Sequence, residues 1–135
     1  MTVLVDTSVW SFALRRKKSA VLNEEQKQLS VLLSQAITDG RVALIGLIRQ
    51  ELLSGIKDQT QFEKLRLHLR AFQDEVLDTA DYEEAAKLYN VCRSRGVECG
   101  PVDMLICAVA SRRRWTVLAN DATLTRCLEV VHSAS

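Results

Sequence analysis

The sequence predicts an α/β fold, in which helices cover a parallel sheet. Short runs of β-branched and aliphatic residues alternate with segments of helical periodicity, and this alternation is typical of strands joined by helical crossovers. Neither a Pro-rich or Gly/Ser-rich linker nor an internal repeat interrupts it. We therefore expect a single domain over residues 1–135, a length that allows about two-thirds of the unfolded surface to be buried.

The strands are predicted from apolar runs that are too short for helices and that end at turn or polar residues. The first run stops abruptly at Asp6, and the second is followed by Gly46. The third run has only two residues, and the last two runs lie on either side of a short helical segment. The predicted strands are residues 3–5, 42–45, 76–77, 116–119 and 129–132.

The helices are predicted from apolar residues three and four positions apart and from residues typical of helix ends. Asp6 and the two hydroxyl residues after it can cap the first helix, Gly40 and Gly96 follow the ends of two others, and Pro101 suits the first turn of another. That last helix is apolar nearly all round, so we expect it at the centre. The predicted helices are residues 9–14, 22–37, 46–55, 61–72, 80–94, 102–112 and 122–127.

The same spacing predicts the side chains that face the core. On the second helix these are Leu22, Leu29, Leu32, Leu33, Ala36 and Ile37. On the fourth they are Phe62, Leu65, Leu69 and Phe72, and on the fifth Ala85, Ala86, Leu88, Tyr89 and Cys92.

Composition excludes several classes of protein. The longest apolar stretches have seven residues, far fewer than the roughly 20 of a membrane span, and the first residues lack the pattern of a secretory signal. We therefore expect a cytoplasmic protein without a membrane association. The four cysteines form no C-x-x-C pair and have no metal-ligand spacing with either histidine, so we expect them to be reduced and mainly structural.

Charge is balanced overall but unevenly distributed. The chain has 18 Lys and Arg against 17 Asp and Glu, which argues against a simple basic nucleic-acid coat. Residues 15–18 and 112–114 are nevertheless entirely basic, and residues 74–84 carry six carboxylates without a base. Each run is either a solvated face or a binding patch.

Four carboxylates stand out by position. Asp6 follows the first predicted strand and Asp121 the fourth, so both belong to the edge of the sheet where open α/β folds place their sites. Asp103 lies in the first turn of the apolar central helix, where a helix dipole stabilises an anion. Glu51 has apolar or small neighbours at three and four residues, so its face is expected to point inward, and a buried charge needs a partner.

Inward carboxylates without an obvious inward base suggest a bound cation. Oxygen ligands alone favour a hard ion such as Mg²⁺ or Mn²⁺, and such ions support phosphodiester hydrolysis. Capping acids and ordinary surface acids remain the alternative explanation for any single position.

Four segments together resemble the PIN-domain ribonucleases, and more narrowly the VapC-type toxins of toxin-antitoxin pairs. The resemblance covers essentially the whole chain in motif order and length. The segments are residues 3–10 (VLVDTSVW), 49–55 (RQELLSG), 101–108 (PVDMLICA) and 117–121 (VLAND).

The resemblance implies a three-layer fold with a five-stranded parallel sheet of order 3-2-1-4-5, flanked by helices, and an acidic pocket that binds one or two Mg²⁺ or Mn²⁺ ions. It implies that Ser8 orients a carboxylate or water and that Asn120 supports the site. Family members often carry a further acid and an aromatic after the fourth acid, where this chain has Thr123 and Leu124, which puts a second ion in doubt. The catalytic and metal-binding acids it implies are Asp6, Glu51, Asp103 and Asp121.

The resemblance also implies a function and partners. The protein would be a metal-dependent endoribonuclease, the toxin of a type II toxin-antitoxin system, inhibited by a small cognate antitoxin and forming a homodimer or a hetero-oligomer with it. The two basic runs are candidates for contacts with RNA phosphates. Trp10 and Trp115 are expected in the core or an interface rather than stacked on bases.

Other families fit less well. A haloacid dehalogenase-like phosphatase needs a second Asp where this chain has Ser8, and nucleotide-binding loops need glycines that residues 6–14 lack. A response regulator needs adjacent acids near the first strand and a Lys after the last. The remaining alternative is a non-catalytic RNA- or protein-binding module on the same fold.

Overall fold

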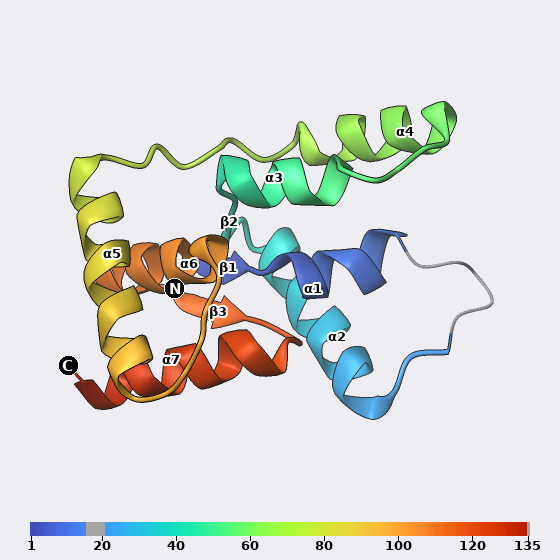
Figure 1. Cartoon of the computed structure of the whole chain (residues 1–135). Coiled ribbons are helices and arrows are strands. Elements are labelled where there is room, and N and C mark those ends of the chain that lie inside the picture. Colours follow the sequence, from blue (N-terminus) through green and yellow to red (C-terminus); the bar gives the residue numbers. More distant parts are fainter. Residues whose placement is uncertain (16–20, 135) are drawn as a thin grey trace.

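A computed structural model describes residues 1–15 and 21–134 (Figure 1). Its sheet has three parallel strands in the order β2-β1-β3. Strand β1 (Val3–Val5) is central and pairs with β2 (Val42–Ala43) and with β3 (Thr116–Leu118). Val3 lies opposite Val42 on one side and Thr116 on the other. The predicted parallel α/β class is confirmed.

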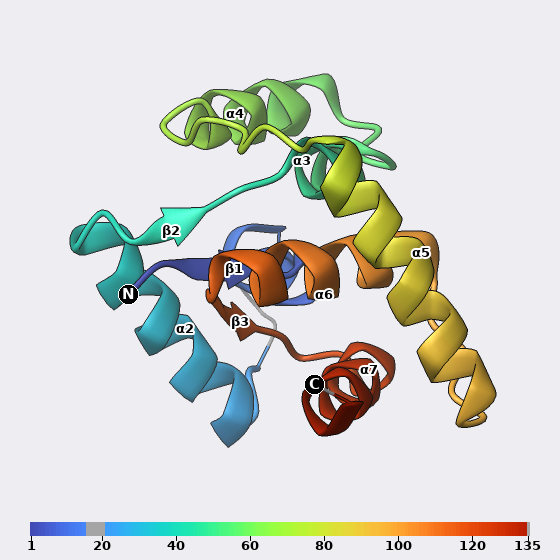
Figure 2. The same cartoon turned by 90° about the vertical axis from the view of Figure 1, so that its left-hand side faces the viewer.

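Helices make up most of the described chain. The first, α1, is followed directly by a π-helical turn, η1. Helices α5, α6 and α7 pack on one another, whereas α2 lies on the other side of the strands (Figures 1 and 2). The elements are α1 (Thr7–Trp10), η1 (Ser11–Arg15), α2 (Glu24–Thr38), α3 (Gly46–Leu53), α4 (Gln59–Leu69), α5 (Thr79–Ser94), α6 (Pro101–Arg113) and α7 (Ala122–Ala134).

The core is centred on β1 and α6. All three residues of β1 are buried, and so is every residue of α6 from Met104 to Ala110. A helix that is apolar all round has no solvent face and has to be covered on all sides, as the sequence predicts for α6. Trp10 is fully buried and packs edge-to-face on Phe72, with ring centroids 5.3 Å apart. Its predicted place in the core is confirmed.

The expected five-stranded sheet is wrong in two places. Residues 76–77 are not a strand; instead Leu44 forms a single parallel bridge with Asp74, which keeps this segment beside β2, where the third strand is expected. Residues 129–132 belong to α7. Leu124, Cys127 and Val131 are buried along one face of α7, and this helical spacing outweighs the short β-branched run at residues 129–132.

Some expected core positions are exposed. Leu32 and Ile37 on α2 are 47% and 41% exposed, and Tyr89 on α5 is 41% exposed. On α5 the side chains that point inward are Asp81, Ala85, Leu88 and Cys92. The spacing of the apolar residues allows two neighbouring faces of α5, and the packing of α5 against α6 selects the one that includes Asp81.

The acidic and basic runs of the sequence meet each other. Asp81 is fully buried, and its carboxylate accepts hydrogen bonds from Arg112 (2.6 Å) and Arg113 (2.7 and 3.0 Å). Arg112 also bonds Asp78 at 3.0 Å, and Arg113 lies 3.5 Å from Glu75. The interpretation as a solvated face is therefore wrong for Asp81, which is buried, whereas Glu75, Asp78 and Arg112 stay exposed while these contacts join the segment around the start of α5 to the end of α6.

The basic run at residues 15–18 is only partly described. Arg15 ends η1, and residues 16–18 lie outside the described residues. Trp115 is half-buried, with the Arg113 guanidinium 5.6 Å from its ring centre.

The cysteines differ from expectation. Cys99 and Cys127 form a disulfide with their Cα atoms 6.5 Å apart, a separation that a disulfide accommodates. Cys92 and Cys107 are free and buried. The pairing was not visible in the sequence because 28 residues separate the two cysteines. Within the described residues, the structure has no helix with the length and apolar character needed to cross a bilayer.

We expect Asp81→Asn to lower the free energy of unfolding by roughly 2–4 kcal/mol at pH 7, because it leaves two arginines without their shared charged partner. The hydrogen bond from Arg113 is the main reason that the pKa of Asp81 lies well below its usual range. This stabilisation is complete above the unfolded pKa of about 3.9 and is lost as the pH falls towards the folded value. Urea unfolding measured between pH 7 and pH 3 tests this.

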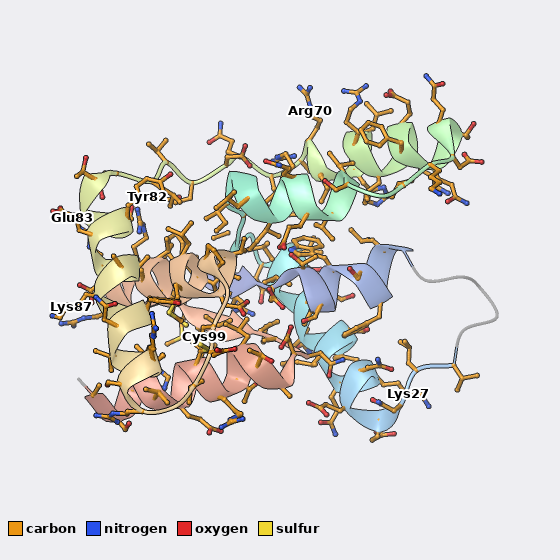
Figure 3. The ribbon with its side chains drawn as sticks, viewed as in Figure 1. Lys27, Arg70, Tyr82, Glu83, Lys87 and Cys99 are labelled. Atoms are coloured by element: carbon orange, nitrogen blue, oxygen red, sulfur yellow. A yellow bond between two sulfur atoms is a disulfide. The ribbon has the colours of Figure 1, made fainter. Side chains whose placement is uncertain are left out.

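Glu83→Gln is the matched control. Glu83 is exposed on the same helix and points away from α6 (Figure 3), so its loss should change stability by less than about 0.5 kcal/mol. Equal effects of the two substitutions would contradict a structural role for Asp81.

Candidate metal-binding and active site

The site lies at the carboxyl edge of the sheet. Asp6 comes directly after β1, and its backbone N–H donates to the carbonyl of Leu118, the last residue of β3, at 2.9 Å. Because β1 and β3 are parallel, this bond holds the two strand ends together at one edge. Asn120 and Asp121 follow β3 at the same edge.

Asp6 is buried and held by Ser8. Its carboxylate caps α1, accepting from the Ser8 backbone N–H at 3.3 Å and from the Ser8 hydroxyl at 2.7 Å. The Ser8 oxygen in turn accepts from the backbone N–H of Asn120 at 2.9 Å. Ser8 thus both caps α1 and links the segments after β1 and β3. Asn120 takes part through its backbone N–H in this contact.

Glu51 lies on α3 and is exposed. The expectation that it faces inward is wrong, because the buried face of α3 carries Ile48 and Leu52, and Glu51 lies outside it. The Thr7 hydroxyl donates to Glu51 at 2.7 Å. Since Thr7 directly follows Asp6, this bond brings Glu51 to the same edge. Sequence reasoning missed Thr7, although a hydroxyl residue next to the first acid was a signal.

Asp103 lies in the first turn of α6 and is half-buried. Burial raises the pKa of Asp103, and a backbone hydrogen bond from Gly100, the N-cap residue, partly opposes this. Pro101 at the start of α6 has no N–H to offer and fits the first turn. Asp103 therefore enters the site at the positive end of the central helix.

Asp121 caps the N-terminus of α7. Its carboxylate accepts from the backbone N–H groups of Thr123 (2.8 Å) and Leu124 (3.1 Å). Leu124 is fully buried, and Thr123 is exposed. These are the two positions where the PIN family often has an acid and an aromatic, and here they add no carboxylate to the cluster.

The four carboxylates act on one another electrostatically. Burial is the largest cause of the raised pKa of Asp103, and the charges of Asp121, Asp6 and Glu51 raise it further. In the described part of the chain, no salt bridge joins any of the four to a lysine or arginine. A cluster of like charges of this kind is stabilised by a cation.

The donor set fits a hard divalent ion. All four side chains offer carboxylate oxygens, and no histidine or cysteine is among them, which suits Mg²⁺ or Mn²⁺. Two of the carboxylates are already oriented by hydroxyl groups and one by backbone N–H groups. Among the described residues, no three of these acids bring their ligand oxygens within 4.8 Å of one another, so the side chains would have to draw closer to enclose one ion.

The fold and the acids define an α/β domain with a carboxylate cluster at the carboxyl edge of a parallel sheet. The sequence matches the family model of the PIN domain over residues 3–127, and the chain belongs to this family. PIN domains are generally nucleases and typically use divalent metal ions.

A solved structure has the same fold. The crystal structure of FitAcB from Neisseria gonorrhoeae aligns with a TM-score of 0.73 and 21% sequence identity, covering 95% of this chain and 94% of that one. Among curated proteins, none matches the sequence.

We expect Asp103→Asn to stabilise the protein in the presence of a chelator, because it removes one charge from a repelling group. The raised pKa of Asp103 in the folded state leads to the same expectation. The folded protein keeps the Asp103 proton to a higher pH than the unfolded chain, so the native protein loses stability as the pH rises from the unfolded pKa to the folded pKa of Asp103. Thermal unfolding in chelator, with native protein and variant side by side, measures the difference.

With Mn²⁺ the order should reverse, because the variant loses a ligand and gains less from the ion. Asp58→Asn is the control, since Asp58 caps α4 outside the site and Asn caps equally well. The site would be contradicted if Asp103→Asn were less stable than the native protein in chelator and if Mn²⁺ stabilised both proteins by the same amount.

Proposed function

We propose that this protein is a metal-dependent endoribonuclease that hydrolyses RNA phosphodiester bonds and acts as the toxin of a type II toxin-antitoxin system. The observation that carries the proposal is the presence of four carboxylates at the sheet edge of a PIN domain, where burial and the charges of the other three raise the pKa of Asp103. Asp6 and Asp121 also cap helices, but capping does not require four acids at one edge, whereas a site that loads a divalent ion does.

Asp6, Glu51, Asp103 and Asp121 would hold the ion. When bound, Mg²⁺ or Mn²⁺ supplies charge neutralisation for the phosphate and lowers the pKa of water. One ion is favoured over two here, because Leu124 and Thr123 contribute no further acid.

Neighbouring residues of the chain would keep the acids in place. Ser8 fixes the rotamer of Asp6 and ties it to Asn120, and Thr7 holds Glu51. The first N–H groups of α7 orient one oxygen of Asp121. These supports are made within the protein before an ion binds, and such support typically improves affinity 10- to 100-fold.

The proposed substrate is an RNA single strand or loop, whose exposed phosphate can reach the acids. Arg112 and Arg113 are not proposed as phosphate contacts, because both are engaged with Asp81.

The proposed inhibitor is a small antitoxin that places a basic side chain among the unpaired acids. Exposed apolar side chains on α2, such as Val31 (56% exposed) and Leu32, offer further contact area for it or for a second toxin copy. We propose that the protein acts in the cytoplasm.

We expect Asp103→Asn to reduce RNA cleavage by at least about 100-fold, because it removes a charged ligand from the ion. The partner-free protein is incubated with total cellular RNA in Mg²⁺, Mn²⁺ or chelator, and new RNA ends are sequenced. Discrete ends that need the metal and vanish in the variant support the nuclease and identify its target.

Asp58→Asn should cleave like the native protein, and circular dichroism verifies that all variants are folded. Cleavage by folded Asp103→Asn at the native rate would overturn the proposed site. Native protein that binds Mn²⁺ but creates no ends with any RNA would favour a non-catalytic binding module.

Thr7→Val should weaken Mn²⁺ binding about 10-fold, because it keeps the size of the side chain but removes the hydrogen bond to Glu51. Calorimetric titration with Mn²⁺ measures the affinity. Thr60→Val is the control, since Thr60 is exposed on α4 outside the site. Equal affinity for native and Thr7→Val protein would show that Thr7 does not position Glu51.

A further inference from the structure

Three cysteines from three segments meet in the interior, away from the acids. Cys92 lies near the end of α5, Cys99 in the connection between α5 and α6, and Cys127 on α7. Their sulfur atoms all lie within 4.8 Å of one another, and all three residues are buried. Cys99 is labelled in Figure 3, in the region enclosed by the three helices.

The Cys99–Cys127 disulfide does not account for the whole cluster. It pairs two of the three sulfurs and leaves the thiol of Cys92 beside them. Reduction by an external dithiol adds two electrons and two protons to the disulfide and gives three neighbouring thiols. A reducing compartment keeps most disulfides in this open state.

Three thiols in one place form a ligand set of defined chemistry. Sulfur ligands without carboxylates favour soft ions such as Zn²⁺ over Mg²⁺. A Zn–S bond of about 2.3 Å places sulfurs about 3.8 Å apart in a tetrahedral shell, which falls within the 4.8 Å spread of this cluster. After reduction, the sulfurs of Cys99 and Cys127 have to move apart from bonding distance to this separation, and Cys92 already lies beside them.

We propose that the reduced protein binds one Zn²⁺ through Cys92, Cys99 and Cys127, at a site separate from the four carboxylates. On binding, three S–H bonds are replaced by three S–Zn bonds, and the three protons pass to solvent. The ion supplies the positive charge that three buried thiolates require. In the described residues, no histidine, aspartate or glutamate joins the cluster, so the fourth position is left for water.

A surface hollow lies beside the segments that carry two of the cysteines. It is lined by Val97, Glu98 and Arg126, which are close neighbours in sequence of Cys99 or Cys127. A zinc site with three protein ligands and one open position exchanges its ion more readily than a closed four-ligand site.

The site would connect the two segments that carry catalytic acids. Cys99 precedes Asp103 by four residues, and Cys127 follows Asp121 by six. An ion that ties the α5–α6 connection to α7 therefore stabilises the arrangement of α6 and α7. The proposal does not rest on the proposed nuclease activity.

Cobalt absorption of the full-length protein tests the site. The protein is reduced with a dithiol, freed of reductant and titrated with Co²⁺ in excess Mg²⁺, which occupies the carboxylates. We expect one Co²⁺ per chain with a thiolate-to-cobalt charge-transfer band that Zn²⁺ displaces. A folded, fully reduced protein without this band would overturn the proposal.

Cysteine variants identify the ligands. Cys92→Ser and Cys99→Ser should lose the band or weaken cobalt affinity at least 100-fold. Cys107→Ser is the matched control, because burial raises the pKa of the Cys107 thiol to about 12 and Cys107 lies outside the cluster. A band lost in Cys107→Ser, or unchanged in Cys92→Ser, would overturn the assignment.

X-ray absorption spectroscopy of the reduced, zinc-bound native protein identifies the ligand atoms without any substitution. We expect three sulfurs at about 2.3 Å, and a shell of oxygen and nitrogen alone would contradict the site even if the variants failed to fold.

Discussion

The pairing of β1 on both of its sides is the constraint on which the rest of this structure depends. β1 has only three residues, all buried, and it is bonded to β2 and to β3. The bond from the Asp6 N–H to Leu118 extends this pairing to the residue where the strand stops. The end of β1 thereby fixes the first acid, and the parallel direction of β3 brings Asn120 and Asp121 to the same edge.

The carboxylate cluster is locally unfavourable because its charges repel one another, and the surrounding fold compensates for part of this cost. Burial and three like charges raise the pKa of Asp103, so the charged cluster costs stability in the absence of a cation. The cost is reduced by groups that stabilise anions: the Ser8 and Thr7 hydroxyls, the backbone of Gly100 before α6, and the first N–H groups of α7. Functional sites typically hold unfavourable charges in place with hydrogen bonds from the surrounding protein.

The interface of α5 with α6 and α7 has a different character. At one end of α5, Asp81 is satisfied by two arginines, and near the other end Cys92 lies beside the Cys99–Cys127 pair. Both features join elements that are adjacent to the site: α6 carries Asp103, and α7 begins after Asp121. The helices opposite α2 thus rely on specific polar and sulfur contacts in addition to apolar packing.

The sequence by itself determined the α/β class and the central position of α6, and it predicts the four acids of the proposed site, because apolar spacing, helix caps and motif order are local signals. Tertiary structure decided the rest. Residues 129–132 became helical because α7 buries Leu124, Cys127 and Val131, and Asp81 is buried because arginines 31 and 32 residues away reach it. Thr7 meets Glu51 across 44 residues, and Cys99 meets Cys127 across 28. Contacts over such separations depend on how the helices pack, which the local pattern of residues does not specify.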